Sequence, residues 1–187
     1  VDDSKVTVLA ALENDRVWNT GDEVVINGVK YTVEEGGQSI VNIEGVAKAD
    51  SYHAAYDTGN GSVNGDMLSV ELPALQSASI EMAYPMVASN GSPNLTFKNI
   101  LGTVRFSILG EGAVKKIVLT SVSGNISGTG SVSMNFTGNP SIKMSSDASN
   151  VLTVDLGKGM TLPAEVDVVL PAGIYEGFMV TAYDTDG

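Results

Sequence analysis

Apolar and polar residues alternate along much of this chain, as they do in half-buried β-strands. The alternation is clearest over residues 68–72, 103–108, 131–136 and 152–156. Successive side chains of a strand point to opposite faces of a sheet, so each of these segments has one apolar face. No window shows a sustained 3.6-residue period, although residues 47–56 are interpreted as able to hold one helical turn. The pattern predicts an all-β fold of about a dozen short strands.

The clearest single element is a predicted β-hairpin near the start of the chain. Asn27 and Gly28 separate two runs rich in β-branched residues, 24–26 and 29–33. An Asn-Gly pair adopts positive φ at both central positions of a tight turn, which is what a two-residue hairpin requires. A preceding strand is predicted over residues 6–10.

The strongest linker signal is the Ser-Asn-Gly-Ser-Pro segment at residues 89–93. We place a domain boundary there, which divides the chain into an N-terminal β-sandwich domain, 1–93, and a C-terminal one, 94–187. A length of 187 residues suits two sandwiches of about 90 residues each. The chain stops on a turn signal at residues 184–187, so we expect the second domain to lack its terminal strands. The sheet edge left unpaired would then be open to another strand.

Composition and charge remove several classes of function. The net charge of −12 disfavours binding to nucleic acids and to anionic membrane surfaces. The chain has no cysteine, which excludes thiol catalysis, cysteine-zinc sites and disulfide bonds. No apolar run approaches the roughly 18 residues that a membrane-spanning helix needs.

The candidate chemical groups do not form a recognisable catalytic set. His53 is the only histidine, and we interpret it as a surface or hydrogen-bonded side chain rather than as part of a triad or zinc site. Glu34 and Glu35 adjoin glycine, and Asp184 and Asp186 lie near the end of the chain, where acids are usually solvated turn residues. The last pair also lacks the third ligand of a calcium loop. We therefore predict no catalytic residue, no metal, no cofactor and no enzymatic activity.

Several short blocks follow one another in a family-like order. They are Trp18-x-x-Gly21-Asp22, Tyr52-His53-Ala54-Ala55-Tyr56, Val70-x-Leu72-Pro73-x-x-Gln76, Leu95-Thr96-Phe97-Lys98-Asn99, and Val169-Leu170-Pro171-Ala172-Gly173-x-Tyr175. Over nearly the whole chain, their order and spacing resemble the fimbrillin-like proteins of the Bacteroidales, which are subunits of the type V pilus. One departure is Asp57, which stands where that family commonly has proline.

The resemblance implies two tandem transthyretin-like β-sandwich domains in an exported lipoprotein that is anchored to the outer membrane. It implies a stalk, tip or anchor subunit of a surface fimbria, whose partners are other fimbrial subunits. In that family a protease removes an N-terminal strand after a basic residue, and a strand from a neighbouring subunit fills the groove by β-augmentation. In this chain the removable strand would carry Val6, Val8 and Ala10, and Arg16 is the nearest basic residue downstream.

A second hypothesis is a cell-surface module that binds a glycan or a host protein. It rests on Trp18, Tyr31, Tyr52 and Tyr56, which would stack on sugar rings if they lined one surface, and on the oxygen-rich loop 57–66. An enzyme is the third hypothesis, and it would need two convergent acids, or an acid beside the single histidine.

Overall fold

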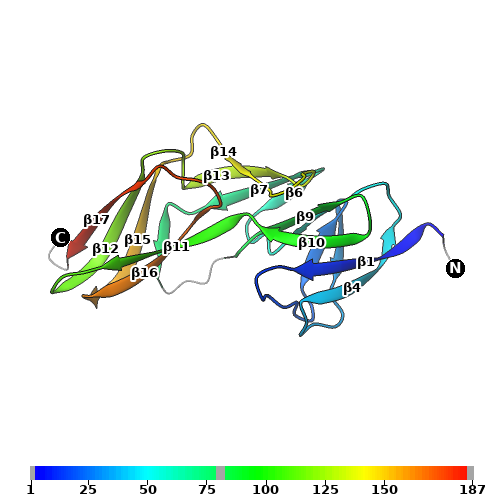
Figure 1. The fold of residues 1–187 in the computed structure, drawn as a ribbon, viewed down its shortest axis with the longest axis horizontal. Helices are drawn as coiled ribbons and strands as arrows, with labels where there is room; N and C mark the ends of the chain where they lie inside the picture. Colours follow the sequence, from blue (N-terminus) through cyan, green and yellow to red (C-terminus); the bar gives the residue numbers. More distant parts are fainter. Residues whose placement is uncertain (1–2, 79–82, 185–187) are drawn as a thin grey trace. The chain divides into compact units, whose positions relative to one another are not determined.

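The computed structural model describes residues 3–78 and 83–184, and every regular element in these two ranges is a β-strand (Figure 1). The strands are β1 (Lys5–Leu12), β2 (Glu23–Ile26), β3 (Val29–Thr32), β4 (Ile40–Ala47), β5 (Tyr52–Tyr56), β6 (Ser62–Asn64), β7 (Met67–Leu72), β8 (Leu75–Ser77), β9 (Met86–Asn90), β10 (Asn94–Asn99), β11 (Leu101–Ile108), β12 (Ala113–Ser121), β13 (Gly128–Ser133), β14 (Ile142–Met144), β15 (Val151–Thr161), β16 (Ala164–Pro171) and β17 (Phe178–Asp184). The predicted all-β fold is confirmed. The helical turn expected within residues 47–56 is wrong, because this segment contains the end of β4 and all of β5.

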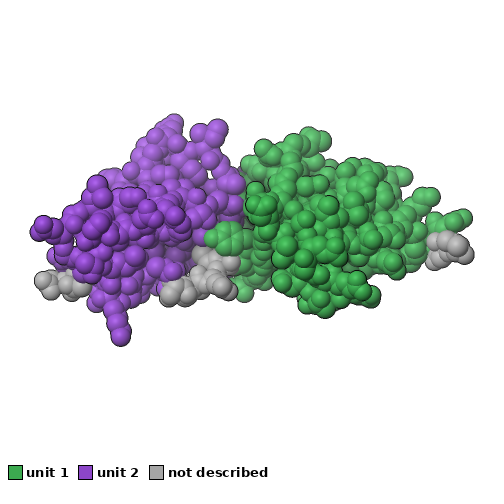
Figure 2. Space-filling view, turned by 60° about the horizontal axis from the view of Figure 1, so that its bottom comes forward, with its two compact units in different colours: residues 1–70, 83–100, 131–142 green, residues 71–82, 101–130, 143–187 purple. Residues whose placement is uncertain are grey.

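The chain forms two compact units, each built from separate stretches of sequence (Figure 2). Unit 1 comprises residues 1–70, 83–100 and 131–142, and unit 2 comprises 71–82, 101–130 and 143–187. The sequence instead suggested a single division near residue 93. In the structure, residues 91–93 form the turn between β9 and β10, and both strands belong to unit 1. Linkers and tight turns favour the same residue types, so composition does not distinguish them.

Unit 1 is organised around a seven-stranded sheet with the order β3-β2-β5-β9-β10-β1-β4. The predicted hairpin is confirmed: β2 pairs with β3 up to Ile26 opposite Val29, and φ is +48° at Asn27 and +79° at Gly28. The core contains a group of three aromatic rings. Trp18 lies 4.5 Å from Tyr56 and 5.4 Å from Phe97 between ring centroids. These rings pack against aliphatic side chains from β1, β2, β4 and β10.

Unit 2 contains a β-sandwich. One layer is the sheet β17-β12-β15-β8 and the other is the pair β11-β16. Ile117 and Val154 from the first layer and Val168 from the second are all fully buried in one hydrophobic cluster, so the two layers share a core. A further four-stranded sheet has the order β14-β13-β7-β6.

Two kinds of feature are absent from the described residues. Residues 3–78 and 83–184 contain no helix of the length and apolarity needed to cross a membrane. In the same part of the chain, no three acidic or histidine side chains lie close enough together to hold a metal ion. The motif at residues 184–187 extends beyond the described residues, which end at Asp184.

Candidate functional site

The candidate removable strand, β1, lies inside the sheet of unit 1 rather than at its edge (Figure 1). It pairs with β10 in parallel, with Leu9 opposite Asn94 and Leu12 opposite Phe97. It pairs with β4 in antiparallel orientation, with Leu9 opposite Asn42. The first strand of the chain is therefore held on both sides by backbone ladders to strands that follow it in the sequence.

The side chains of β1 alternate between the core and the outer face. Val8 and Ala10 are fully buried, and Val6 is half-buried against the same cluster. Leu9, between them, is 40% exposed. The ladder to β4 contains a register shift between Val6 and Val8, so pairing is most regular from Val8 onward. Loss of this strand would expose core side chains of unit 1 and two backbone edges.

Trp18 makes one contact with β1 that does not depend on the identity of a β1 side chain. Its indole Nε1 donates a hydrogen bond of 3.1 Å to the backbone carbonyl oxygen of Ala10, and this bond is buried. Trp18 itself is fully buried. Buried indole N–H groups need an acceptor, so the tryptophan of the first family-like block helps to hold β1 in place.

Arg16 is tied to other parts of unit 1. Its guanidinium Nη2 lies 2.8 Å from Oδ2 of Asp57, and its Nη1 donates a bond of 3.1 Å to the carbonyl oxygen of Tyr84. The guanidinium carbon also lies 5.4 Å from the centroid of the Tyr56 ring. The Asp57 carboxylate accepts a second bond, from the backbone N–H of Tyr84. Asp57, which departs from the family pattern, is therefore the ion-pair partner of the candidate cleavage residue.

Tyr56 extends this group of contacts toward the preceding loop. Its hydroxyl donates a bond of 2.7 Å to Oδ2 of Asp22. Burial, together with that hydrogen bond, raises the pKa of the Tyr56 hydroxyl well above its ordinary value. The Asp22 carboxylate also accepts the backbone N–H of Asn19. The block that contains Trp18 and Asp22 thus connects β1, through Trp18, with Tyr56 of β5, through Asp22.

His53 is a buried, hydrogen-bonded side chain. Of the two predicted alternatives, a surface or a hydrogen-bonded residue, the second is confirmed. Its Nδ1 lies 3.1 Å from the carbonyl oxygen of Met134, and its Nε2 lies 3.2 Å from Oγ of Ser51. A carbonyl oxygen only accepts, so the contact with Met134 places a proton on Nδ1. Within residues 3–78 and 83–184, the hydrogen-bond partners of this ring include no carboxylate.

The aromatic residues that suggested sugar stacking do not form an exposed platform. Trp18, Tyr52 and Tyr56 are all at least 93% buried, and Tyr31 is half-buried against the same core. Their faces pack against neighbouring side chains. These four aromatic residues therefore belong to, or pack against, the hydrophobic core of unit 1.

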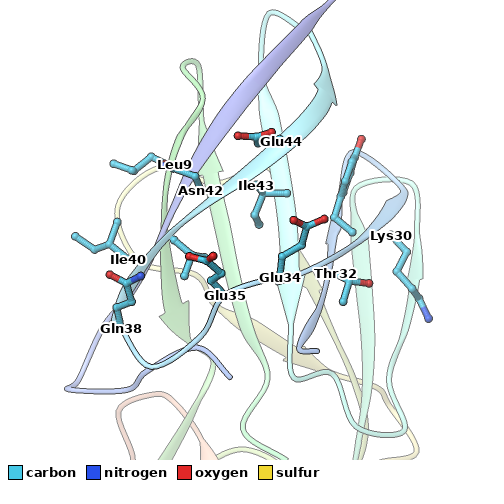
Figure 3. A pocket seen from close by; sticks show the side chains of 12 residues that line it. Leu9, Lys30, Thr32, Glu34, Glu35, Gln38, Ile40, Asn42, Ile43 and Glu44 are labelled. Atoms are coloured by element: carbon cyan, nitrogen blue, oxygen red, sulfur yellow. The ribbon is translucent and has the colours of Figure 1, made fainter. Parts of the chain in front are cut away.

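Unit 1 contains a groove of about 870 Å³ that the sequence analysis did not predict (Figure 3). Figure 3 shows Leu9, Ile40 and Asn42 on one side of it and Lys30 and Thr32 on the other. Its other lining residues are Tyr31, Glu34, Glu35, Gln38, Val41, Ile43 and Glu44. Adjacent glutamates beside glycine suggested only solvated turn acids, because the edge order of the sheet is not visible in the sequence.

This chain is similar in fold to a known structure, but no model of a protein family matches the chain, and no curated protein does. The fold is similar to the crystal structure of a candidate cell adhesion protein from Bacteroides ovatus ATCC 8483, with a TM-score of 0.59. The two sequences are 13% identical, and the alignment covers 98% of this chain and 84% of that one. At this identity the likeness establishes a shared all-β fold.

Proposed function

We propose that this chain is a non-enzymatic cell-surface adhesion protein that assembles by β-strand exchange, in which a strand from a neighbouring subunit takes the place of its first strand. Fold similarity to a candidate adhesion protein of Bacteroides ovatus supports the surface role. The finer reading is a fimbrial subunit, lipid-anchored to the outer membrane before assembly, and it rests on the family-like blocks of the sequence.

The position of β1 is the observation that carries the proposal. This strand lies between β10 and β4, and residues 13–17 connect it to Trp18. A strand from another subunit that placed apolar side chains where Val8 and Ala10 lie would restore both ladders and refill the core. This is β-augmentation, in which main-chain bonds give affinity and alternate side chains enter pockets.

The ion pair between Arg16 and Asp57 must open before a protease can cut the chain after Arg16. Cleavage after Arg16 requires the segment to enter a protease, whereas the structure holds its side chain against Asp57 and Tyr84. The Arg16 and Asp57 side chains are 29% and 30% exposed, so opening the pair requires only local motion at the surface. We therefore propose that release of Asp57 precedes removal of β1.

Disulfide trapping tests the exchange directly, because the natural chain has no cysteine. Leu9 lies opposite Asn42 across the antiparallel ladder, where paired Cα atoms are about 4.5–5.5 Å apart and within disulfide range. The two single variants Leu9→Cys and Asn42→Cys are mixed, treated with an arginine-specific protease and oxidised. The chain has two arginines, Arg16 and Arg105, so mass spectrometry identifies the cut directly.

The expected result is a disulfide between residues 1–16, released from the Leu9→Cys variant by cleavage at Arg16, and the cysteine of the Asn42→Cys variant. It would show that the place of β1 accepts a strand from another chain. The double variant Leu9→Cys/Asn42→Cys should form the bond within one chain and thereby show that the geometry permits it. Leu109→Cys, at a residue that is 80% exposed, replaces Leu9→Cys in the control mixture. Cross-linking no greater than in this control mixture, while the double variant closes readily, would rule out strand exchange.

A further inference from the structure

The two edges of the unit 1 sheet lie on either side of the groove. In the strand order, β3 ends the sheet on one side and β4 ends it on the other, and the groove is lined by residues of both. Within residues 3–78 and 83–184, no strand pairing joins β3 to β4. Each edge strand has main-chain N–H and C=O groups that face away from its one neighbour, and such edges are templates for a further strand.

The groove reaches the hydrophobic core at its inner side and carries apolar side chains on its outer side. Val41 and Ile43, which are 6% and 3% exposed, belong both to its lining and to the core cluster of unit 1. Leu9 and Ile40 are 40% and 48% exposed. An extended segment lying along β4 would therefore contact apolar surface with both sets of its alternating side chains.

Charge determines which kind of segment fits. Glu34, Glu35 and Glu44 line the groove, and Lys30 is its one basic residue. The Lys30 ammonium lies 3.0 Å from Oε2 of Glu23, so a carboxylate outside the groove lining already compensates it. The groove is thus negative, and a segment with lysine or arginine near these glutamates complements it.

We infer that the groove between β3 and β4 binds an extended, basic segment of a partner protein in which apolar residues alternate with lysine or arginine. The segment pairs with the free edge of β4 and closes the sheet of unit 1. A second copy of this chain fits poorly, because its net charge is −12. The inference goes beyond strand exchange, since β1 stays in place while the segment binds.

A capped, fluorescein-labelled nine-residue peptide that alternates lysine and valine is the probe. Fluorescence anisotropy at low salt measures its binding to the full chain. One comparison peptide replaces every lysine with glutamate, and another has the same composition with the lysines and valines in two blocks. Amide hydrogen exchange on the same samples reports whether residues 40–47 gain protection.

Two matched protein variants distinguish binding that depends on the groove glutamates from binding that depends only on the net charge of the protein. Glu34→Gln/Glu35→Gln/Glu44→Gln removes three charges from the groove lining. The control variant removes three charges from exposed positions of unit 2: Glu71→Gln, Glu111→Gln and Glu176→Gln. Its net charge changes by the same amount.

The alternating lysine peptide should bind and protect residues 40–47. The groove variant should bind it about tenfold more weakly, as expected for the loss of three partly screened charge contacts, while the control variant stays within about twofold of the unaltered chain. Equal weakening in both variants would show attraction by net charge alone and overturn the inference. Equal binding of the glutamate peptide, no added protection of β4, or no binding at all would also overturn it. None of these outcomes depends on β1 exchange, which the disulfide experiment measures separately.

Discussion

The side-chain amide of Gln76 should be one of the strongest single contributors to the stability of unit 2. Gln76 lies in β8 and is 5% exposed. Its Nε2 donates a bond of 2.7 Å to the carbonyl oxygen of Val169, and its Oε1 accepts the backbone N–H of the same residue at 3.0 Å. The amide therefore pairs with a residue of β16 as a neighbouring strand would, and joins the two layers of the sandwich.

The substitution Gln76→Ala leaves two buried backbone groups of Val169 without partners. Each such group costs about 1–3 kcal/mol, and water entering the vacated space recovers part of that cost. We expect the free energy of unfolding of unit 2 to fall by about 2–4 kcal/mol, which corresponds to a fall in melting temperature of roughly 10–20 °C for a unit of this size.

The assay must observe unit 2 itself. The single tryptophan, Trp18, belongs to unit 1, so intrinsic tryptophan fluorescence reports the other unit. Hydrogen exchange over residues 164–171 and differential scanning calorimetry are the suitable measurements. Gln38→Ala, at an exposed glutamine, is the matched control and should change neither.

The variant Gln76→Glu provides a second test, because its stability should depend on pH. An ionised carboxylate still accepts the N–H of Val169 but has no proton for its carbonyl oxygen. Burial raises the pKa of the introduced carboxyl in the folded state, so this variant should be most stable in acid and lose stability as the pH rises through that folded-state value. A loss below about 0.5 kcal/mol for Gln76→Ala, or unchanged exchange at Val169, would refute the role assigned to this amide.

Three further predictions concern separate parts of the chain. Trp18→Phe should lower the unfolding free energy of unit 1 by about 1–3 kcal/mol in urea titrations, because the buried carbonyl of Ala10 loses the hydrogen bond from the indole N–H. Gly28→Ala should cost about 1 kcal/mol by the same measurement, since φ is +79° there while nothing lies within 4 Å of the added methyl group. Hydrogen bonding to Arg105 lowers the pKa of the Asp167 carboxyl, so any stability that this pair adds is present above the ordinary aspartate pKa and lost as the pH falls through the depressed value. Arg105→Gln should return that pKa toward its ordinary range in a carboxyl ¹³C NMR titration.

Sequence patterns predicted several of the strands in which one face is buried and the other is exposed. In β15, Leu152 and Val154 are buried while the intervening Thr153 is half-buried, and the alternation of the sequence shows this directly. The alternation of apolar and polar residues did not predict strand β5. All five residues of Tyr52–Tyr56 are buried, so the strand has no polar face and its sequence shows no alternation. The mistaken helical turn there follows from burial on both faces.

Long-range pairing explains what the sequence could not predict. Strand β1 lies beside residues 94–97, and its parallel register with them has no local sequence signal. The contact between Arg16 and Asp57 joins two loops that are distant in the sequence, and it gave Arg16 partners that its local context did not suggest. The groove has the same origin, because Glu34 and Glu44 line one depression only after the sheet order makes β3 and β4 its edges.

Most of the contacts that hold β1 are ones that a strand from another subunit would also make under the proposed exchange. Its backbone pairs with β10 and β4, and Trp18 binds the backbone carbonyl of Ala10; any extended polypeptide offers these groups. The core requires from β1 only aliphatic side chains at alternate positions, such as Val8 and Ala10. The contacts specific to this chain begin after the strand, at Arg16, where cleavage is proposed. These contacts constrain the form of β1 more than its sequence, which is what the proposed strand exchange would require of unit 1.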